Sequence, residues 1–172
     1  VEKECKNVKE TVGLLDMTAF AKCRIKGPGA EEFLDKLVAN KLPKKVGRIN
    51  LCHALNTKGG VHSEFTIMRE SENSFYLVSA GAYQRLDHDW IFGWMPKDGS
   101  VQFENLTNSK GVLVVSGPKA RELMQRVSND DFSNENFKWL SAKQVDVGFA
   151  PVNAMRVNFV GELGWELHHP IE

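Results

Sequence analysis

A carboxylate in the middle of a strand-like segment is the first residue of this sequence that suggests chemistry. From Val61 to Met68 the side chains alternate between two faces, which predicts a β-strand. One face carries Val61, Ser63, Phe65 and Ile67, and the other carries His62, Glu64, Thr66 and Met68. Because glutamate is depleted in strands, Glu64 is either a solvated residue of an outer face or a carboxylate placed to act in a reaction.

Two histidines near Glu64 raise the alternative of a metal site. If His53 and His62 lie opposite each other across a hairpin, Glu64 follows two residues further along the His62 face. Two imidazoles and a carboxylate can bind a metal ion. No further ligand is evident, and His168 and His169 fall on opposite faces of a strand, so we predict no metal site. No order of Ser, His and Asp typical of a hydrolase stands out either.

The elements that must position Glu64 form an antiparallel meander over about residues 50–79. A turn cluster at 56–60 precedes the strand of Glu64, and a second turn at 72–74 leads into a strand at 75–78. Helical spacing of apolar residues predicts helices at about 28–39, 83–94 and 118–127, and a short polar helix over 2–12. Further strands are predicted at 23–26, 101–106, 111–115, 143–148 and 152–160.

One local pattern occurs twice in the sequence. Gly27-Pro28 follows a strand and opens a helix, and Gly117-Pro118 does the same later in the chain. Two related strand–helix units together with antiparallel meanders predict an α+β fold with a pseudo-repeat.

Composition excludes several classes of protein. The 172 residues carry 22 basic and 22 acidic side chains without a polybasic run, so we expect neither a nucleic-acid nor a membrane partner. No apolar run is long enough to span a membrane. Cys5, Cys23 and Cys52 form no CxxC pair, which indicates reduced thiols in an intracellular setting, the cytoplasm or the mitochondrial matrix. No glycine-rich GxGxxG motif for FAD or another nucleotide is present.

Five motifs in order carry a family resemblance. They are GLLDMTAFAKCRIKGPGAEEFLDKLVAN (13–40), LNTKGGVHSEFTIMRE (55–70), FYLVSAG (75–81), LVVSGPKA (113–120) and VGELGWEL (160–167). Together they resemble the folate-binding aminomethyltransferase family of the glycine cleavage T-protein, in particular its dimethylglycine dehydrogenase branch. The resemblance covers the whole chain and corresponds to the N-terminal part of the family's module.

The resemblance implies a fold and a set of site residues. The family's fold has three lobes around a channel for tetrahydrofolate, and we expect residues 1–172 to supply two of them, about 1–50 with 140–172, and about 51–139. The family's carboxylate beside the reacting folate nitrogens falls on Glu64, although T-proteins carry Asp there. The last carboxylate of the GE-x-G-x-E motif, which binds the pterin ring, falls on Glu166. Trp165 beside it is either a stacking ring or a core residue, and Glu166 itself is a solvent-facing residue in the alternative reading.

A further position departs from the family pattern. Where the family often has Asn after the third meander strand, this chain has Ala80, so that pterin contact is absent or is supplied otherwise.

The function implied by the resemblance is one-carbon metabolism. The family's transferases capture a methylene from an oxidised methylamine, or an aminomethyl donor, to give 5,10-methylenetetrahydrofolate. Expected partners are the small-molecule substrate and the remaining parts of the same polypeptide or a flavin subunit. FAD is expected only if a further N-terminal domain lies outside this chain. The alternative is a module that binds folate or an amine without catalysis.

Overall fold

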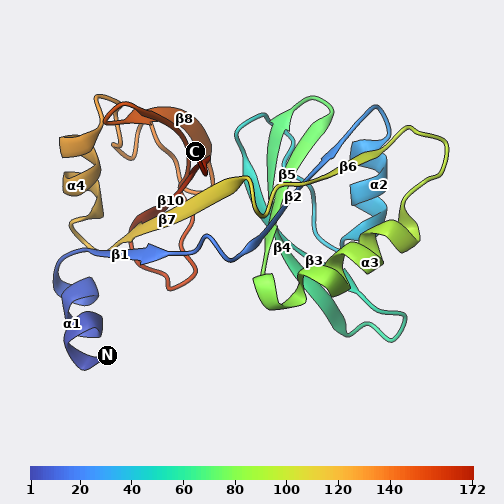
Figure 1. Ribbon diagram of the computed structural model, residues 1–172, viewed down its shortest axis with the longest axis horizontal. Helices are drawn as coiled ribbons and strands as arrows, with labels where there is room; N and C mark the ends of the chain where they lie inside the picture. The colour runs from blue at the N-terminus through green and yellow to red at the C-terminus, as the bar shows by residue number, and fades with distance from the viewer. The chain divides into compact units, whose positions relative to one another are not determined.

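The computed structural model describes residues 1–172, which form two antiparallel sheets with helices beside them (Figure 1). The helices are α1 (Glu2–Glu10), α2 (Ala30–Leu37), the short η1 (Gly81–Tyr83), α3 (Gln84–Trp94) and α4 (Ala120–Val127). The strands are β1 (Gly13–Asp16), β2 (Ala21–Lys26), β3 (Ile49–Leu55), β4 (Val61–Ser71), β5 (Ser74–Ser79), β6 (Gln102–Asn105), β7 (Lys110–Ser116), β8 (Ala142–Val147), β9 (Ala150–Met155) and β10 (Gly164–Pro170). The α+β class, the four predicted helices and the meander over 50–79 are confirmed.

The chain forms two compact units. Unit 1 consists of residues 1–18 and 109–172, and unit 2 consists of residues 19–108. This division differs from the lobes expected from the sequence, because the boundary is set by strand pairing. Residues 1–18 carry β1, whose partner is β7, whereas residues 19–50 carry β2, whose partners are β5 and β6.

Unit 2 has its core between one face of its sheet and the helices α2 and α3. Alternation within the strands turns Ile25, Phe65 and Leu77 inward, where they are almost fully buried. Helix α2 buries Phe33 and Leu34 against them, as its amphipathic sequence predicts. Burial of such side chains contributes about 1.5–3 kcal/mol each. This burial therefore fixes which side chains of each strand face the helices.

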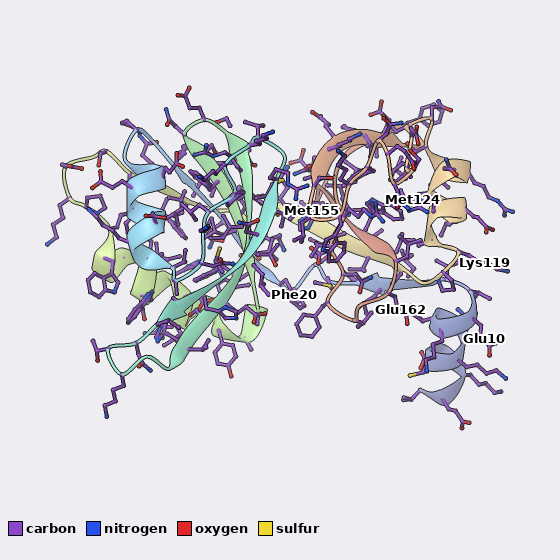
Figure 2. The ribbon with its side chains drawn as sticks, turned by 180° about the vertical axis from the view of Figure 1, so that it is seen from behind. Glu10, Phe20, Lys119, Met124, Met155 and Glu162 are labelled. Atoms are coloured by element: carbon purple, nitrogen blue, oxygen red, sulfur yellow. The ribbon has the colours of Figure 1, made fainter.

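Unit 1 is built in the same way around α4. Ala120 and Met124 are the buried residues of this helix (Figure 2), and they pack with Val115 and Trp165 from the sheet. Lys119 before the helix is exposed to solvent. The second face of the sheet is buried as well, with Met155 and other side chains of that face inaccessible. None of the helices of the protein is long and apolar enough to cross a membrane.

The two units repeat one topology, which confirms the predicted pseudo-repeat. The strand order is β3-β4-β5-β2-β6 in unit 2, and reading unit 1 in the corresponding direction gives β8-β9-β10-β7-β1. The registers agree too: Ile25 pairs with Phe75 in one sheet, and Val115 pairs with Trp165 in the other. The Gly-Pro turn precedes the helix in both units.

Glycine is required at the start of both turns. Gly27 and Gly117 have φ angles of 121° and 131°, which side chains rarely adopt. A Cβ atom at either position would also overlap a backbone carbonyl oxygen, that of Ser100 or that of Thr11. The motif seen in the sequence therefore marks a place where the chain turns tightly against the segment before an edge strand.

The edge strands are exchanged between the repeats. β1 directly precedes β2 in the sequence but pairs with β7, whereas β6 directly precedes β7 but pairs with β2. The ends of both strands are fixed by the same bonds. Val112 N donates to Thr18 Oγ1 (3.1 Å), and Lys22 N donates to Thr107 Oγ1 (3.0 Å). Each repeat is thus completed by a strand that belongs, in sequence, to the other.

Two strand predictions need correction. No strand was predicted over residues 13–16, yet they form β1, because pairing with β7 supplies hydrogen bonds that no local sequence signal indicates. The strand predicted at 152–160 ends at Met155. Beyond it, Leu140 N donates to Arg156 O (3.1 Å) and Val157 N donates to Met155 O (2.9 Å), so the chain turns away from the ladder.

This exchange predicts how fragments of the chain behave. Residues 19–108 hold every strand of the unit 2 sheet, so this fragment should show helix and strand content by circular dichroism and unfold cooperatively. Residues 109–172 lack β1, which leaves β7 as an unpaired edge, and they should fold only when residues 1–18 are joined to them through a flexible linker. Equal folding of 109–172 with and without residues 1–18 would contradict the exchanged arrangement.

Candidate functional site

Glu64 lies on β4 directly opposite His53 of β3. The two side chains meet with 2.9 Å between Glu64 Oε2 and His53 Nε2, and they are 47% and 36% exposed. Directly opposed side chains on one face of an antiparallel pair are close enough for such a contact. Glu64 is therefore a carboxylate that solvent and small molecules can reach, with one oxygen held by an imidazole.

A β-bulge separates His62 from this pair. Ala54 pairs with Ser63 and Leu55 pairs with Val61, so His62 is the extra residue of the bulge. Its ring stacks on Trp90 of α3, with 4.1 Å between the ring centroids and 29° between the planes. The arrangement of His53, His62 and Glu64 considered as a metal site is not formed, and no group of three or more potential ligands occurs.

A buried carboxylate fixes the backbone on which Glu64 stands. Asp87 of α3 accepts hydrogen bonds from the hydroxyl groups of Ser63 (2.5 Å) and Ser79 (2.6 Å). These bonds tie the helix to β4 and β5, and the hydrogen bonds satisfy a charged group that would be costly to bury alone. Sequence reasoning missed this network, although a serine at a core-facing strand position next to Glu64 was a signal for it.

The second predicted carboxylate is buried. Glu166 and His168 lie on the same face of β10, with side chains 8% and 2% exposed and 3.1 Å between Glu166 Oε2 and His168 Nε2. Glu166 is thus not a solvent-facing residue. Because a buried carboxylate needs hydrogen-bond partners, it is an acceptor held in a defined position.

Trp165 points to the opposite face of β10, into the core of unit 1. Its side chain has no exposed area, and the rings of Phe132 and Phe137 meet it edge to face at 5.2 and 5.9 Å. The guanidinium groups of Arg121 and Arg156 lie 5.9 and 5.7 Å from its ring centre. This is the core role given above as the alternative for Trp165.

Ala80 lies at the end of the meander, just before η1. Its side chain is exposed and carries no polar atom, while its carbonyl oxygen accepts a hydrogen bond from Tyr83 N (3.0 Å). Gly81 follows, and a Cβ atom there would overlap the carbonyl oxygen of Ala19. The segment offers a ligand backbone atoms and a methyl group, not an amide side chain.

Glu64 and Glu166 do not occupy equivalent positions in the two repeats. Pairing registers match Glu64 of unit 2 with Pro151 of unit 1, and Glu166 of unit 1 with Tyr76 of unit 2. Each unit therefore carries one of the two carboxylates at a position where the other unit has a different residue.

Two arginines without acidic partners hold the loop beside Trp165. Arg121 and Arg156 each donate a hydrogen bond of 2.7 Å to the side-chain oxygen of Asn134. They also donate to the backbone carbonyl oxygens of Phe132 and Phe137. Burial and the neighbouring charge of Arg121 lower the pKa of Arg156. Two adjacent positive charges thus share a neutral acceptor.

Known protein structures share this arrangement of strands and helices. Two repeats of five strands with exchanged edge strands define a module of the aminomethyltransferase T-protein fold. The structure of glycine cleavage system aminomethyltransferase T from Bartonella henselae superimposes with a TM-score of 0.83 at 22% identity, over 98% of this chain and 45% of that chain. The heterotetrameric sarcosine oxidase from Corynebacterium sp. U-96 gives a TM-score of 0.72 at 18% identity, over 95% of this chain and 80% of that one.

The sequence identifies the family. The GCVT N-terminal domain model matches residues 1–172, so the chain belongs to that family, which confirms the resemblance. It is 39% identical to human mitochondrial dimethylglycine dehydrogenase over 170 residues, 98% of this chain and 20% of that protein. It is 33% identical to the mouse mitochondrial pyruvate dehydrogenase phosphatase regulatory subunit over 175 residues, all of this chain and 20% of that protein. The chain thus spans about a fifth of the length of these relatives.

Burial predicts which thiols react. Burial, with the charge of Asp87 adding to it, raises the pKa of Cys23 to about 12, and burial raises the pKa of Cys52 to about 11. Because the thiolate is the reactive form, only the exposed Cys5 should react with a thiol reagent at pH 8 in the native protein. All three should react in denaturant, and Cys5→Ser should abolish the native reaction. Rapid native labelling of that variant would contradict the burial of the other two.

The arginine pair predicts a stabilising substitution. Asn134→Asp places a carboxylate where two guanidinium groups already donate, and charge-assisted hydrogen bonds are stronger than neutral ones. Because Asn134 is exposed, the gain in the free energy of unfolding should be about 0.5–1 kcal/mol, measured by urea denaturation, and should shrink in 1 M NaCl. The control Asn134→Ala should lower the free energy of unfolding. If Asn134→Asp is no more stable than the wild type, the idea that Arg121 and Arg156 lack a compensating negative charge is wrong.

Proposed function

We propose that this chain is the folate-binding part of a tetrahydrofolate-dependent one-carbon transferase. It would capture a methylene from an oxidised methylamine of the dimethylglycine or sarcosine type, or an aminomethyl donor, to give 5,10-methylenetetrahydrofolate. Membership of the GCVT N-terminal domain family and the likeness to dimethylglycine dehydrogenases support this. The observation that carries it is a pair of carboxylates, one accessible and one buried, at the positions the family's motifs mark.

The donor and acceptor chemistry of these residues fits a folate. A pterin ring presents an amino group and ring N–H groups, which require acceptors. Glu166 is an acceptor whose Oε2 is engaged by His168, and Oε1 has lone pairs available for a ligand N–H. Trp165 is enclosed by the core, so the proposal assigns it support of β10 and not contact with the ring. Ala80 contributes no polar side chain.

Glu64 is the residue proposed to act in the reaction. Tetrahydrofolate, when bound, supplies the nucleophilic amine nitrogens that take up the carbon unit. Glu64 Oε1 would accept the proton that such a nitrogen releases, while Oε2 stays with His53. The same negative charge stabilises positive charge that develops beside it.

The donor for this reaction would be made elsewhere. Oxidation of a methylamine needs a redox cofactor, and this chain has no glycine-rich nucleotide motif, so FAD would belong to further parts of the polypeptide or to a flavin subunit. The length of the relatives supports such further parts. We also propose the mitochondrial matrix as the location, since the named mammalian relatives are mitochondrial proteins.

A second candidate function is a module that binds folate or an amine without catalysis. One observation favours it: a relative 33% identical over the whole chain is named as a regulatory subunit. The glutamate at position 64, where the T-proteins have aspartate, fits either candidate.

Substitutions in the full-length protein distinguish the two candidates. If Glu64 accepts a proton, Glu64→Gln should lower the rate of transfer to tetrahydrofolate about 10²–10⁴-fold with little change in folate affinity. If Glu166 anchors the pterin, Glu166→Gln should weaken folate binding by about 1–3 kcal/mol, with a smaller effect on the saturated rate. Rapid-quench assays give the rate, and calorimetry gives the affinity.

The controls make the outcome decisive. Glu162→Gln removes a half-buried acidic side chain of the same motif region (Figure 2) and should change neither quantity. Unchanged transfer by Glu64→Gln would remove the catalytic assignment. Tight folate binding with no transfer in the wild-type protein would favour the binding module.

A further inference from the structure

We propose that His53 is a positioning residue for Glu64, and that the length of the glutamate side chain at position 64 is what lets it reach this histidine. The inference rests on the proposed function, since it concerns how the proton acceptor is held. It is carried by the direct cross-strand pairing of the two residues and the contact of 2.9 Å between Nε2 and Oε2.

His53 is held on both sides of its strand. β3 is an edge strand of its sheet, and β4 bonds to one side of it. On the other side, Ala39 N donates to the carbonyl oxygen of His53 (2.8 Å), and the Asn40 side chain donates to the carbonyl oxygen of Leu51 (2.6 Å). The strand edge is therefore closed by residues 39–40, and the backbone beneath the imidazole cannot shift easily.

The chemistry of the contact assigns a role to each oxygen of Glu64. An ionised carboxylate only accepts hydrogen bonds, so the contact requires a hydrogen on His53 Nε2. That bond fixes Oε2 and orients Oε1 for another partner. A half-exposed glutamate without such a bond would sample several rotamers, and ordering it would oppose catalysis by lost side-chain entropy.

The length of the side chain matters because the two Cα positions are fixed by strand pairing. An aspartate at position 64 is one methylene shorter, and the carboxylate would be drawn back toward its own strand by roughly an ångström. With His53 opposite, the shorter acid would lose the bond. Glu64 and His53 thus form one functional pair, and the effect of changing either should depend on the other.

Other titratable groups around the pair are engaged elsewhere or lie at the margins. His62 stacks on Trp90, Arg69 pairs with Glu31, and Glu70 pairs with Arg24. Asp87 accepts from Ser63 and Ser79, Lys41 follows the segment along the edge of β3, and Lys58 lies in the hairpin turn.

The experiment uses the full-length protein with His53→Gln, which keeps an N–H donor, and His53→Leu, which removes the donor. His53→Leu should lower the saturated transfer rate about 10- to 100-fold, with the KM for tetrahydrofolate within about twofold. His53→Gln should recover most of the rate, because it restores the N–H donor. His169→Gln is the matched histidine control and should behave as wild type. Thermal melting of each variant separates loss of function from loss of structure.

Glu64→Asp completes a double-mutant cycle. In the presence of His53 the substitution should reduce transfer, and in the His53→Leu background it should have little further effect. Additive effects, or a His53→Leu rate equal to that of the wild type, would overturn the inference. Glu64→Gln in the same assay identifies which idea has failed: if it too transfers normally, the proposed function falls, and if it alone is impaired, only the role of His53 falls.

Discussion

The pairing of β1 with β7 and of β6 with β2 is the constraint on which the rest of this structure depends. Each edge strand completes the sheet of the repeat to which it does not belong in sequence. The same backbone-to-threonine bonds end both pairings, with Thr18 and Thr107 in equivalent places. Because of this exchange, residues 1–18 belong to unit 1 although the segment that follows them builds unit 2. The exchange also explains why both turns require glycine. Gly27 and Gly117 lie against the backbone of the segments that lead into the exchanged strands β6 and β1.

A repeated scaffold carries a site that is not repeated. The pleat of β10 sends Trp165 into the core and Glu166 to the other face, and the pleat of β5 does the same with Phe75 and Tyr76. The inward positions are filled by aromatic rings in both units, because each core needs volume there. The next positions lie on the opposite face, where unit 1 has the buried Glu166 and unit 2 the buried Tyr76. The two units therefore share the filling of their helix-covered cores and differ on the opposite face.

The two carboxylates have different environments, which fit the different roles proposed for them. Glu166 is almost fully buried beside His168, which suits an acceptor that recognises fixed donors. Glu64 is half-exposed beside His53, which suits a group that must exchange protons with its surroundings. Asp87 is a third kind of carboxylate, one whose oxygens are both occupied by serine hydroxyls and which serves only to hold α3 to the sheet.

The sequence by itself determined the local elements and the family. Period-two alternation at 61–68, helical spacing at 30–37 and the two Gly-Pro turns correspond to β4, α2 and the helix starts of both repeats, because these signals depend on neighbouring residues. The five motifs likewise pointed to the family and to Glu64 and Glu166. They gave no indication of the strand at 13–16, whose only cause is a partner about a hundred residues away.

Only the tertiary structure decided what surrounds the two carboxylates. His62, considered as a metal ligand, lies at a β-bulge and stacks on Trp90. The register of β3 with β4 places His53, and not His62, opposite Glu64. Trp165 is buried in the core, and Glu166 is also buried and does not face the solvent. The physical reason is the same in each case. Alternation assigns a side chain to a face, but pairing register and the packing of distant segments decide what lies on that face.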